Sequence, residues 1–177
     1  GADRSLQTTM LAAGSAGIEP VLFCPPGVAM HFWAEDVGIA VEPCELAYRD
    51  KWHPLRWWRS VARLKRRFRR RGIEVVHANQ VWAYPAAGTA AGALGLPRIC
   101  HMRDEVPGDA IAWCCRSGVE LVLSISDYIQ KQVEAEWPAS IARPRLEALI
   151  NPVQMPPGLS AEEEAEARRS ARQQWGP

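Results

Sequence analysis

Polar side chains directly after short apolar runs are the residues of this sequence best placed to do chemistry. In Ile99-Cys-His-Met-Arg-Asp104, His101 ends an apolar run, and Arg103 and Asp104 follow it. In open α/β sheets, ligands bind outside the carboxyl ends of the strands. An imidazole there can contact a hydroxyl, share a proton with a phosphate or stabilise charge. A structural histidine bonded to the backbone is the alternative, and the position at the end of the run favours a functional role.

A second group of polar and aromatic residues follows the apolar segment Glu74-Val-Val-His-Ala78. His77 and Asn79 come first, and Trp82 and Tyr84 lie a few residues further on. At adjacent strand ends, such side chains can form one wall of a ligand cleft. A capped loop over a buried tryptophan explains the same residues equally well, and both interpretations stay open.

Two more candidates stand where helices are expected to begin. Ser126 and Asp127 follow an apolar run, and a helix-capping role for this pair is favoured over a ligand contact from Ser126. The opening Gly1-Ala2-Asp3-Arg4 leads directly into a helix, where backbone N–H groups can approach an anion. On the residues alone, an ordinary turn with Asp3 in the first helical turn is the favoured interpretation.

The elements that must position these groups alternate along the chain. Strands are expected at 20–24, 39–42, 74–78, 98–101, 120–125 and 146–150, and helices at 3–15, 55–71, 84–94, 108–117 and 127–136. Strands this apolar are typical of a parallel sheet covered on both faces. Gly72 and Gly95 stand where left-handed helix caps are wanted, and Asp127 stands where an N-cap is wanted. The pattern predicts an α/β domain with a Rossmann-like parallel sheet and helices on both faces.

The domain is expected to occupy residues 1–150. Residues 151–159 form a linker stiffened by three prolines, and 160–177 open a helix with capping-box spacing, as if a second domain were starting. At the front, the helix at 3–15 has no strand before it, so the predicted sheet lacks its central first strand. We therefore expect the isolated chain to be poorly stable, and a cooperative melt at high temperature would contradict this.

Composition excludes several classes of protein. Hydrophobic residues make up 47% and charged residues 23%, which is ordinary for a soluble globular domain. No apolar run approaches the roughly 18 residues of a membrane span, and no targeting segment is visible. Five cysteines without a Cys-x2-Cys pair argue against a disulfide framework and against a zinc site, and they favour a reducing, cytoplasmic setting.

The net charge of +1 hides one strongly cationic segment. Residues 52–71 hold nine Lys or Arg and no acid, which leaves twelve basic and twenty acidic residues elsewhere, or −8. Apolar residues recur within the segment at helical spacing, namely Trp57, Val61, Leu64 and Phe68. A helix packed on the sheet with a solvated basic face is the simplest explanation. Docking of residues 55–71 on an anionic membrane surface is a sharper one, whereas nucleic-acid binding is disfavoured because no matching motif accompanies the charge.

Taken in order, these segments resemble the N-terminal, acceptor-side domain of glycosyltransferase family 4, which has the GT-B fold of two facing Rossmann-like domains. Gly1-Ala2-Asp3-Arg4 is similar to the end of that family's Gly-Gly-x-Glu-Arg turn. Further matching segments are Arg71–Ala78, Leu96–His101, the strand ending at Ser126, and Ile150-Asn-Pro-Val-Gln154. The resemblance covers essentially the whole chain, and it implies the N-terminal half of a GT-B fold without its first strand.

The resemblance also implies an activity. Family members transfer a sugar from a nucleotide diphosphate sugar to a sugar or lipid-linked acceptor, usually with retention and with no essential metal or cofactor. The family roles put the backbone of Gly1, Ala2 and Asp3 near the donor phosphates or the acceptor. They put His101 beside the transferred sugar as the catalytic residue. Further substrate contacts are expected from Asn79, Arg103, Asp104, Ser126 and Asn151.

Three departures from the family pattern matter. Asn79 stands where many members have a second histidine, Gln154 replaces an aspartate, and no Glu-x7-Glu donor motif occurs. We therefore expect a hexosyltransferase segment that is inactive alone, cytoplasmic, and peripheral at the inner membrane face if the basic helix binds lipid. A non-catalytic flavodoxin-like binding domain and a membrane-binding module are the alternatives.

Overall fold

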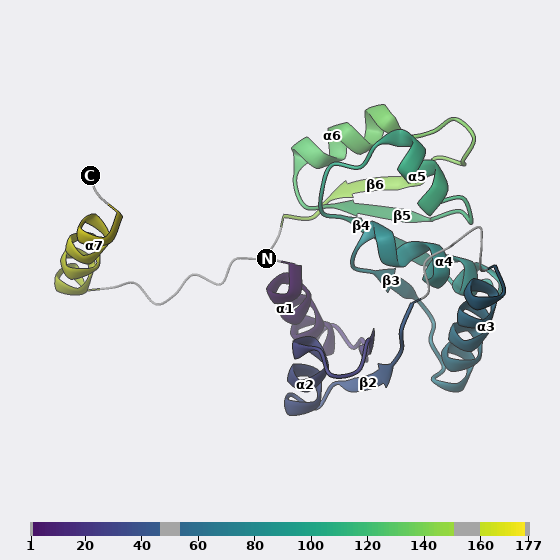
Figure 1. Ribbon diagram of the computed structural model, residues 1–177, viewed down its shortest axis with the longest axis horizontal. Coiled ribbons are helices and arrows are strands. Elements are labelled where there is room, and N and C mark those ends of the chain that lie inside the picture. Colours follow the sequence, from purple (N-terminus) through teal and green to yellow (C-terminus); the bar gives the residue numbers. More distant parts are fainter. Residues whose placement is uncertain (1, 47–53, 151–159, 176–177) are drawn as a thin grey trace.

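The computed structural model describes residues 2–46, 54–150 and 160–175 (Figure 1). Its helices are α1 (Ala2–Ser15), α2 (Ala29–Asp36), α3 (Pro54–Arg70), α4 (Tyr84–Gly92), α5 (Gly108–Cys114), α6 (Asp127–Glu136) and α7 (Ala161–Trp175), with a 3-10 turn η1 (Val81–Ala83). Its strands are β1 (Val21–Cys24), β2 (Ala40–Pro43), β3 (Val76–Ala78), β4 (Arg98–Met102), β5 (Leu121–Ser124) and β6 (Arg145–Ala148). The alternation expected from the sequence is confirmed, with α2 and η1 as additional elements. Within these ranges, no helix is both long enough and apolar enough to cross a membrane.

The strands form two parallel sheets. β1 pairs with β2, and β3, β4, β5 and β6 form a four-stranded sheet in that order. The sheet that holds β1 is therefore separate from the sheet that holds β3. Because all pairings are parallel, the carboxyl ends of β3, β4 and β5 meet at one edge of the larger sheet.

One face of the larger sheet packs against α5 and α6. Cys100, Met102 and Val122 on the strands are fully buried, together with Ile111 of α5 and Val133 of α6. Full burial of a side chain of this size contributes about 1.5–3 kcal/mol. This cluster fixes β4 and β5, and therefore the edge at which they end.

The apolar stripe of α3 packs as the sequence predicts. Trp57, Val61, Leu64 and Phe68 are all buried, and they share a cluster with small residues of α4, namely Ala86, Ala87, Ala90 and Ala91. The small side chains of α4 let the two helices approach closely. A third cluster joins α1 and α2 to the small sheet through Met10, Leu22 and Met30. All five cysteines are buried with free thiols.

Helix ends confirm most of the predicted caps. Gly72 and Gly95 have φ values of 62° and 69°, and the following N–H groups of Ile73 and Leu96 donate back to Phe68 and Ala91 at 3.0 and 3.1 Å. In α7, the Ser160 N–H donates to Glu163 at 2.8 Å, and the Glu163 N–H donates to the Ser160 hydroxyl at 3.3 Å, which is the predicted capping box.

The expected N-cap of α6 is wrong by one residue. The Ser126 hydroxyl accepts from the Ile129 N–H at 3.2 Å, and Asp127 is the first helical residue. Ser126 has the extended backbone that a capping residue needs, with φ −159° and ψ 162°. Asp127 instead places its negative charge in the first turn, where the helix dipole favours it.

A buried carboxylate accounts for part of the basic segment. Glu42, near the end of β2, is 5% exposed, and it contacts two arginines of the last turn of α3 and the arginine that follows the helix. Arg70 Nη2 lies 2.6 Å and Arg67 Nε 3.3 Å from Glu42 Oε1, and Arg71 Nε lies 2.8 Å from Oε2. Three of the nine cations therefore join α3 to the small sheet.

Candidate functional site

Two histidines lie together at the carboxyl edge of the larger sheet. His77 on β3 is in register with Ile99 on β4, two residues before His101, so both imidazoles lie on the same face. Their rings stack with centroids 5.6 Å apart and an interplanar angle of 20°. His101 is only 3% exposed, whereas His77 is exposed.

Arg103 connects the loop after β3 to His101. Its Nε donates to the Asn79 backbone carbonyl at 2.9 Å, and its Nη2 donates to Asn79 Oδ1 at 2.5 Å. The same Nη2 lies 3.4 Å from Nδ1 of His101. Arg103 is 9% exposed, so these contacts are largely shielded from water. Asn79, Arg103 and His101 thus form one hydrogen-bonded group across a strand pair.

The surroundings of His101 keep its ring neutral. The pKa of His101 is lowered to about 3, mainly by burial and to a smaller extent by the Arg103 cation and by His77. Its Nε2 is buried and has no hydrogen-bond partner among the residues that the structure describes. Desolvation and Arg103 also lower the pKa of His77 to about 4, although that residue is exposed.

The start of α1 approaches the same edge. Burial lowers the pKa of Arg103, and the carboxylates of Asp104 and Asp3 oppose this shift, so both acids lie near the guanidinium. Ala2 and Asp3 form the first turn of α1, which begins on the side towards which the β6 arrow points in Figure 1. A helix N-terminus there favours a bound anion.

The remaining predicted site residues divide into three cases. Ser126 is engaged as the cap of α6, while its position after β5 keeps it at the carboxyl edge of the sheet. Gly1 and Asn151 lie outside the described residues. His77, which the sequence indicates only as part of a possible cleft wall, stacks on His101 at this edge.

The aromatic residues near Asn79 behave differently from one another. Trp82 is 47% exposed, so the interpretation of a buried tryptophan is wrong. Tyr84 is fully buried and donates its hydroxyl to the Gly118 carbonyl, so it is a core residue and not part of a cleft wall. Within the described ranges, no three His, Cys, Asp or Glu residues are arranged to hold a metal ion.

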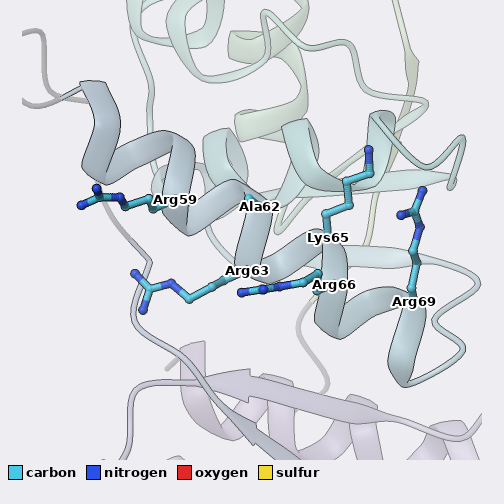
Figure 2. Close-up of a pocket in the computed structure, with 6 residues that line it drawn as sticks. All are labelled: Arg59, Ala62, Arg63, Lys65, Arg66 and Arg69. Carbon is cyan, nitrogen blue, oxygen red and sulfur yellow. The ribbon is translucent and has the colours of Figure 1, made fainter.

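A second candidate surface lies on the outer side of α3. A hollow of about 560 Å³ is lined by Arg59, Ala62, Arg63, Lys65, Arg66 and Arg69 (Figure 2). These cations have no ion pair with another described residue, unlike the three that hold Glu42. Leu55 and Trp58, at the start of the same helix, are 68% and 56% exposed. The hollow includes none of the residues at the strand ends.

Comparison with known proteins identifies the class of this chain. The family model described as glycosyl transferase 4-like domain matches residues 1–125, and the chain therefore belongs to that family. No curated protein matches it in sequence. The resemblance drawn from the sequence is confirmed, including its assignment to a family 4 glycosyltransferase domain.

Solved glycosyltransferases of the GT-B fold share the architecture. Acinetobacter baumannii MurG superposes with a TM-score of 0.60 at 15% identity, over 82% of this chain and 41% of that one. Anabaena HepE in complex with UDP-glucose superposes with a TM-score of 0.64 at 17% identity, over 99% of this chain and 46% of that one. Its complex with UDP and glucose superposes with a TM-score of 0.65 at 16% identity, over 99% of this chain and 47% of that one. The chain spans less than half the length of each. At these identities the likeness establishes the fold.

Proposed function

We propose that this chain contributes the acceptor-side domain of a glycosyltransferase that uses a nucleotide diphosphate sugar. The supporting observation is the meeting of His101, Arg103, Asn79 and the start of α1 at the carboxyl edge of a parallel sheet. That edge is where open α/β sheets bind ligands. The reaction is transfer of a hexose to a sugar or lipid-linked hydroxyl with retention at the anomeric carbon, and it needs a second domain to close the cleft.

The chemistry available at this edge is polar and electrostatic. The N–H groups at the start of α1 and the Arg103 cation favour the negative charge that develops on a departing diphosphate. A neutral His101 can donate to an oxygen of the sugar or of the phosphate. The domain itself carries no donor motif of the Glu-x7-Glu type, so we expect it to bind but not to turn over substrate alone. No cofactor is part of this proposal.

The activity is tested by measuring sugar transfer from UDP-glucose and other nucleotide sugars by the full natural chain. His101→Ala should lower turnover about 100-fold, which is the effect typical of removing one donor at developing charge. His31→Ala is the matched control, because His31 lies on α2 and contacts Glu35 at 3.2 Å. Equal turnover in the wild type and His101→Ala would remove His101 from the chemistry.

A second proposed property is docking of α3 on an anionic membrane surface, with the acceptor then presented from the lipid. The exposed cations of α3 and the neighbouring Leu55 and Trp58 favour it, because basic residues near anionic lipid contribute roughly 1 kcal/mol each. In this arrangement the protein is cytoplasmic and peripheral at the inner membrane face.

Vesicle co-sedimentation tests the membrane docking. Replacement of Arg59, Arg63, Arg66 and Arg69 by Gln should weaken binding to phosphatidylglycerol-containing vesicles by about 100-fold or more at low salt. The control removes four exposed arginines elsewhere, Arg116, Arg143, Arg145 and Arg172, and should bind nearly as well as the wild type. Equal loss in both variants would indicate a non-specific charge effect and refute docking through α3.

A further inference from the structure

The hydrogen-bond donor beside His101 determines which ring nitrogen of that histidine carries the proton. A guanidinium has only N–H donors and no acceptor, and it stays charged at any physiological pH. Arg103 Nη2 lies 3.4 Å from Nδ1 of His101, so this contact is favourable only if Nδ1 is unprotonated and accepts. In a neutral imidazole the proton must then be on Nε2.

We propose that Arg103 is a positioning residue that holds His101 in its neutral Nε2–H tautomer, so that His101 presents a hydrogen-bond donor, and not a base, to the substrate. The substrate in this statement rests on the proposed glycosyl transfer. The tautomer itself rests only on the geometry of Asn79, Arg103 and His101. This tautomer assigns His101 the role of a hydrogen-bond donor in the reaction, which the location of the residue alone does not.

Asn79 makes the position of Arg103 specific. Two acceptors of the same residue, its backbone carbonyl and Oδ1, receive Nε and Nη2 of Arg103 at 2.9 and 2.5 Å. A planar guanidinium held through two of its nitrogens has a fixed orientation. The nitrogen that faces Nδ1 of His101 is therefore not free to rotate away, and Arg103 is itself 9% exposed.

The other groups that face this cluster do not supply a competing acceptor to His101 in the described structure. His77 stacks on His101 through its ring face, at 5.6 Å between centroids. The carboxylates of Asp3 and Asp104 act on Arg103 and support its charge. The buried Nε2 has no partner among the described residues. A buried N–H at Nε2 requires an acceptor oxygen, and a sugar hydroxyl or a diphosphate oxygen supplies one only when substrate binding exposes this nitrogen.

The tautomer can be read directly in the full chain labelled with ¹⁵N-histidine. Long-range ¹H–¹⁵N spectra at pH 7 distinguish protonated from unprotonated ring nitrogens, and substitution of each of the four histidines in turn assigns the signals. We expect His101 to show an unprotonated Nδ1 and a protonated Nε2. A protonated Nδ1, an even mixture of tautomers or an imidazolium would overturn the proposal.

Variants separate the role of Arg103 from a general effect on packing. Arg103→Met should convert the single tautomer of His101 into a mixture, whereas Arg103→Lys should preserve it. Asn79→Ala should change the tautomer ratio less than Arg103→Met does, because the backbone carbonyl at position 79 still accepts from Arg103. An unchanged tautomer in a folded Arg103→Met protein would refute the role of Arg103. If that variant does not fold, the wild-type tautomer and Asn79→Ala decide the question.

The kinetic measurement shows whether the tautomer matters for transfer. In the full chain with UDP-glucose, we expect Arg103→Met to lower kcat at least tenfold with KM changed less, and Arg103→Lys to recover most of the loss. Equal kcat in the wild type and Arg103→Met would show that the tautomer has no catalytic consequence. If the wild type transfers no sugar from any donor, the proposed function fails, whereas the NMR result on His101 stands or falls independently.

Discussion

Replacement of Glu42 by Gln is the most direct test of how the basic helix is held. Glu42 is 5% exposed, and the side chains of Arg67, Arg70 and Arg71 around it are 28%, 66% and 40% exposed. Well-covered hydrogen bonds to a charged group contribute about 1.5–3 kcal/mol each, and exposed ion pairs about 0–1 kcal/mol. Since this cluster lies between the two cases and Gln keeps one acceptor, we expect a loss of about 2 kcal/mol at pH 7.

The dependence on pH gives this prediction its specific signature. Burial alone would raise the pKa of Glu42, but hydrogen bonds from Arg71 and Arg70 outweigh it and hold the pKa below its usual value. A depressed carboxyl pKa stabilises the fold above the unfolded pKa of about 4.3, and this contribution is lost as the pH falls through the folded pKa. The difference between wild type and Glu42→Gln should therefore be constant from pH 8 to 5 and should shrink below pH 4.

Urea unfolding followed by tryptophan fluorescence measures the effect, because the buried Trp57 lies on α3. A loss of about 2 kcal/mol corresponds to a Tm lower by roughly 4–8 °C in a chain of this size. Glu45→Gln is the matched control, since Glu45 is an exposed carboxylate three residues away, and it should change stability little. A stability difference of Glu42→Gln that is zero at pH 7, or that persists undiminished at pH 3, would refute the reasoning.

Three further predictions concern residues at helix ends and at the site. Ser126→Ala should destabilise the protein by about 1 kcal/mol in urea unfolding, and Ser126→Asp should restore the cap; a loss of sugar transfer that Asp does not restore would indicate a ligand contact instead. Gly72→Ala should cost about 1–2 kcal/mol, because φ is +62° while the space for a Cβ is open; an unchanged midpoint would show that the helix end relaxes freely. His101→Asn should make the protein less sensitive to acid. Because the folded protein keeps His101 neutral down to about pH 3, its stability falls as the pH drops below the unfolded histidine pKa of about 6.5, and the loss reaches about 2 kcal/mol at pH 5. Parallel pH–stability curves for wild type and His101→Asn would contradict that assignment.

Most of the fold was predictable because β1 to β5 are short, mostly apolar runs, and each follows a glycine with positive φ that ends the preceding segment. The expected strand at 98–101 ends one residue later, at Met102, and the expected helix at 127–136 matches α6. Helix α2 was missed because Pro25-Pro26-Gly27 indicates a turn, and the eight residues of α2 lack an N-cap hydrogen bond. Its burial against β1 through Met30 and Ala34 is a tertiary effect that local pattern does not show.

The site was predictable in its location and less so in its connections. Placement of His101 and Asn79 at adjacent strand ends follows from the parallel register, which the sequence indicates. The pairing of Arg103 with Asn79, 24 residues apart, depends on where a long side chain folds back, and no spacing rule gives that. The ion pairs of Glu42 with the arginines at the end of α3 were not predicted for the same reason, because the position of a single glutamate in a strand does not indicate which residues it contacts.

At position 79, where the resemblance drawn from the sequence implies a histidine in many family members, this chain has an asparagine, and its amide suits the electrostatics of the site. A second histidine there would titrate near neutral pH and would add either a donor or an acceptor beside Arg103, depending on its charge. The Asn79 amide presents an acceptor at every pH, and Arg103 uses it together with the backbone carbonyl. Arg103 is then available to His101 Nδ1 in one orientation, and its positive charge helps to keep that imidazole neutral. The amide at 79 and the neutral His101 are therefore two parts of one arrangement, which supplies a fixed hydrogen-bond donor where the strands end.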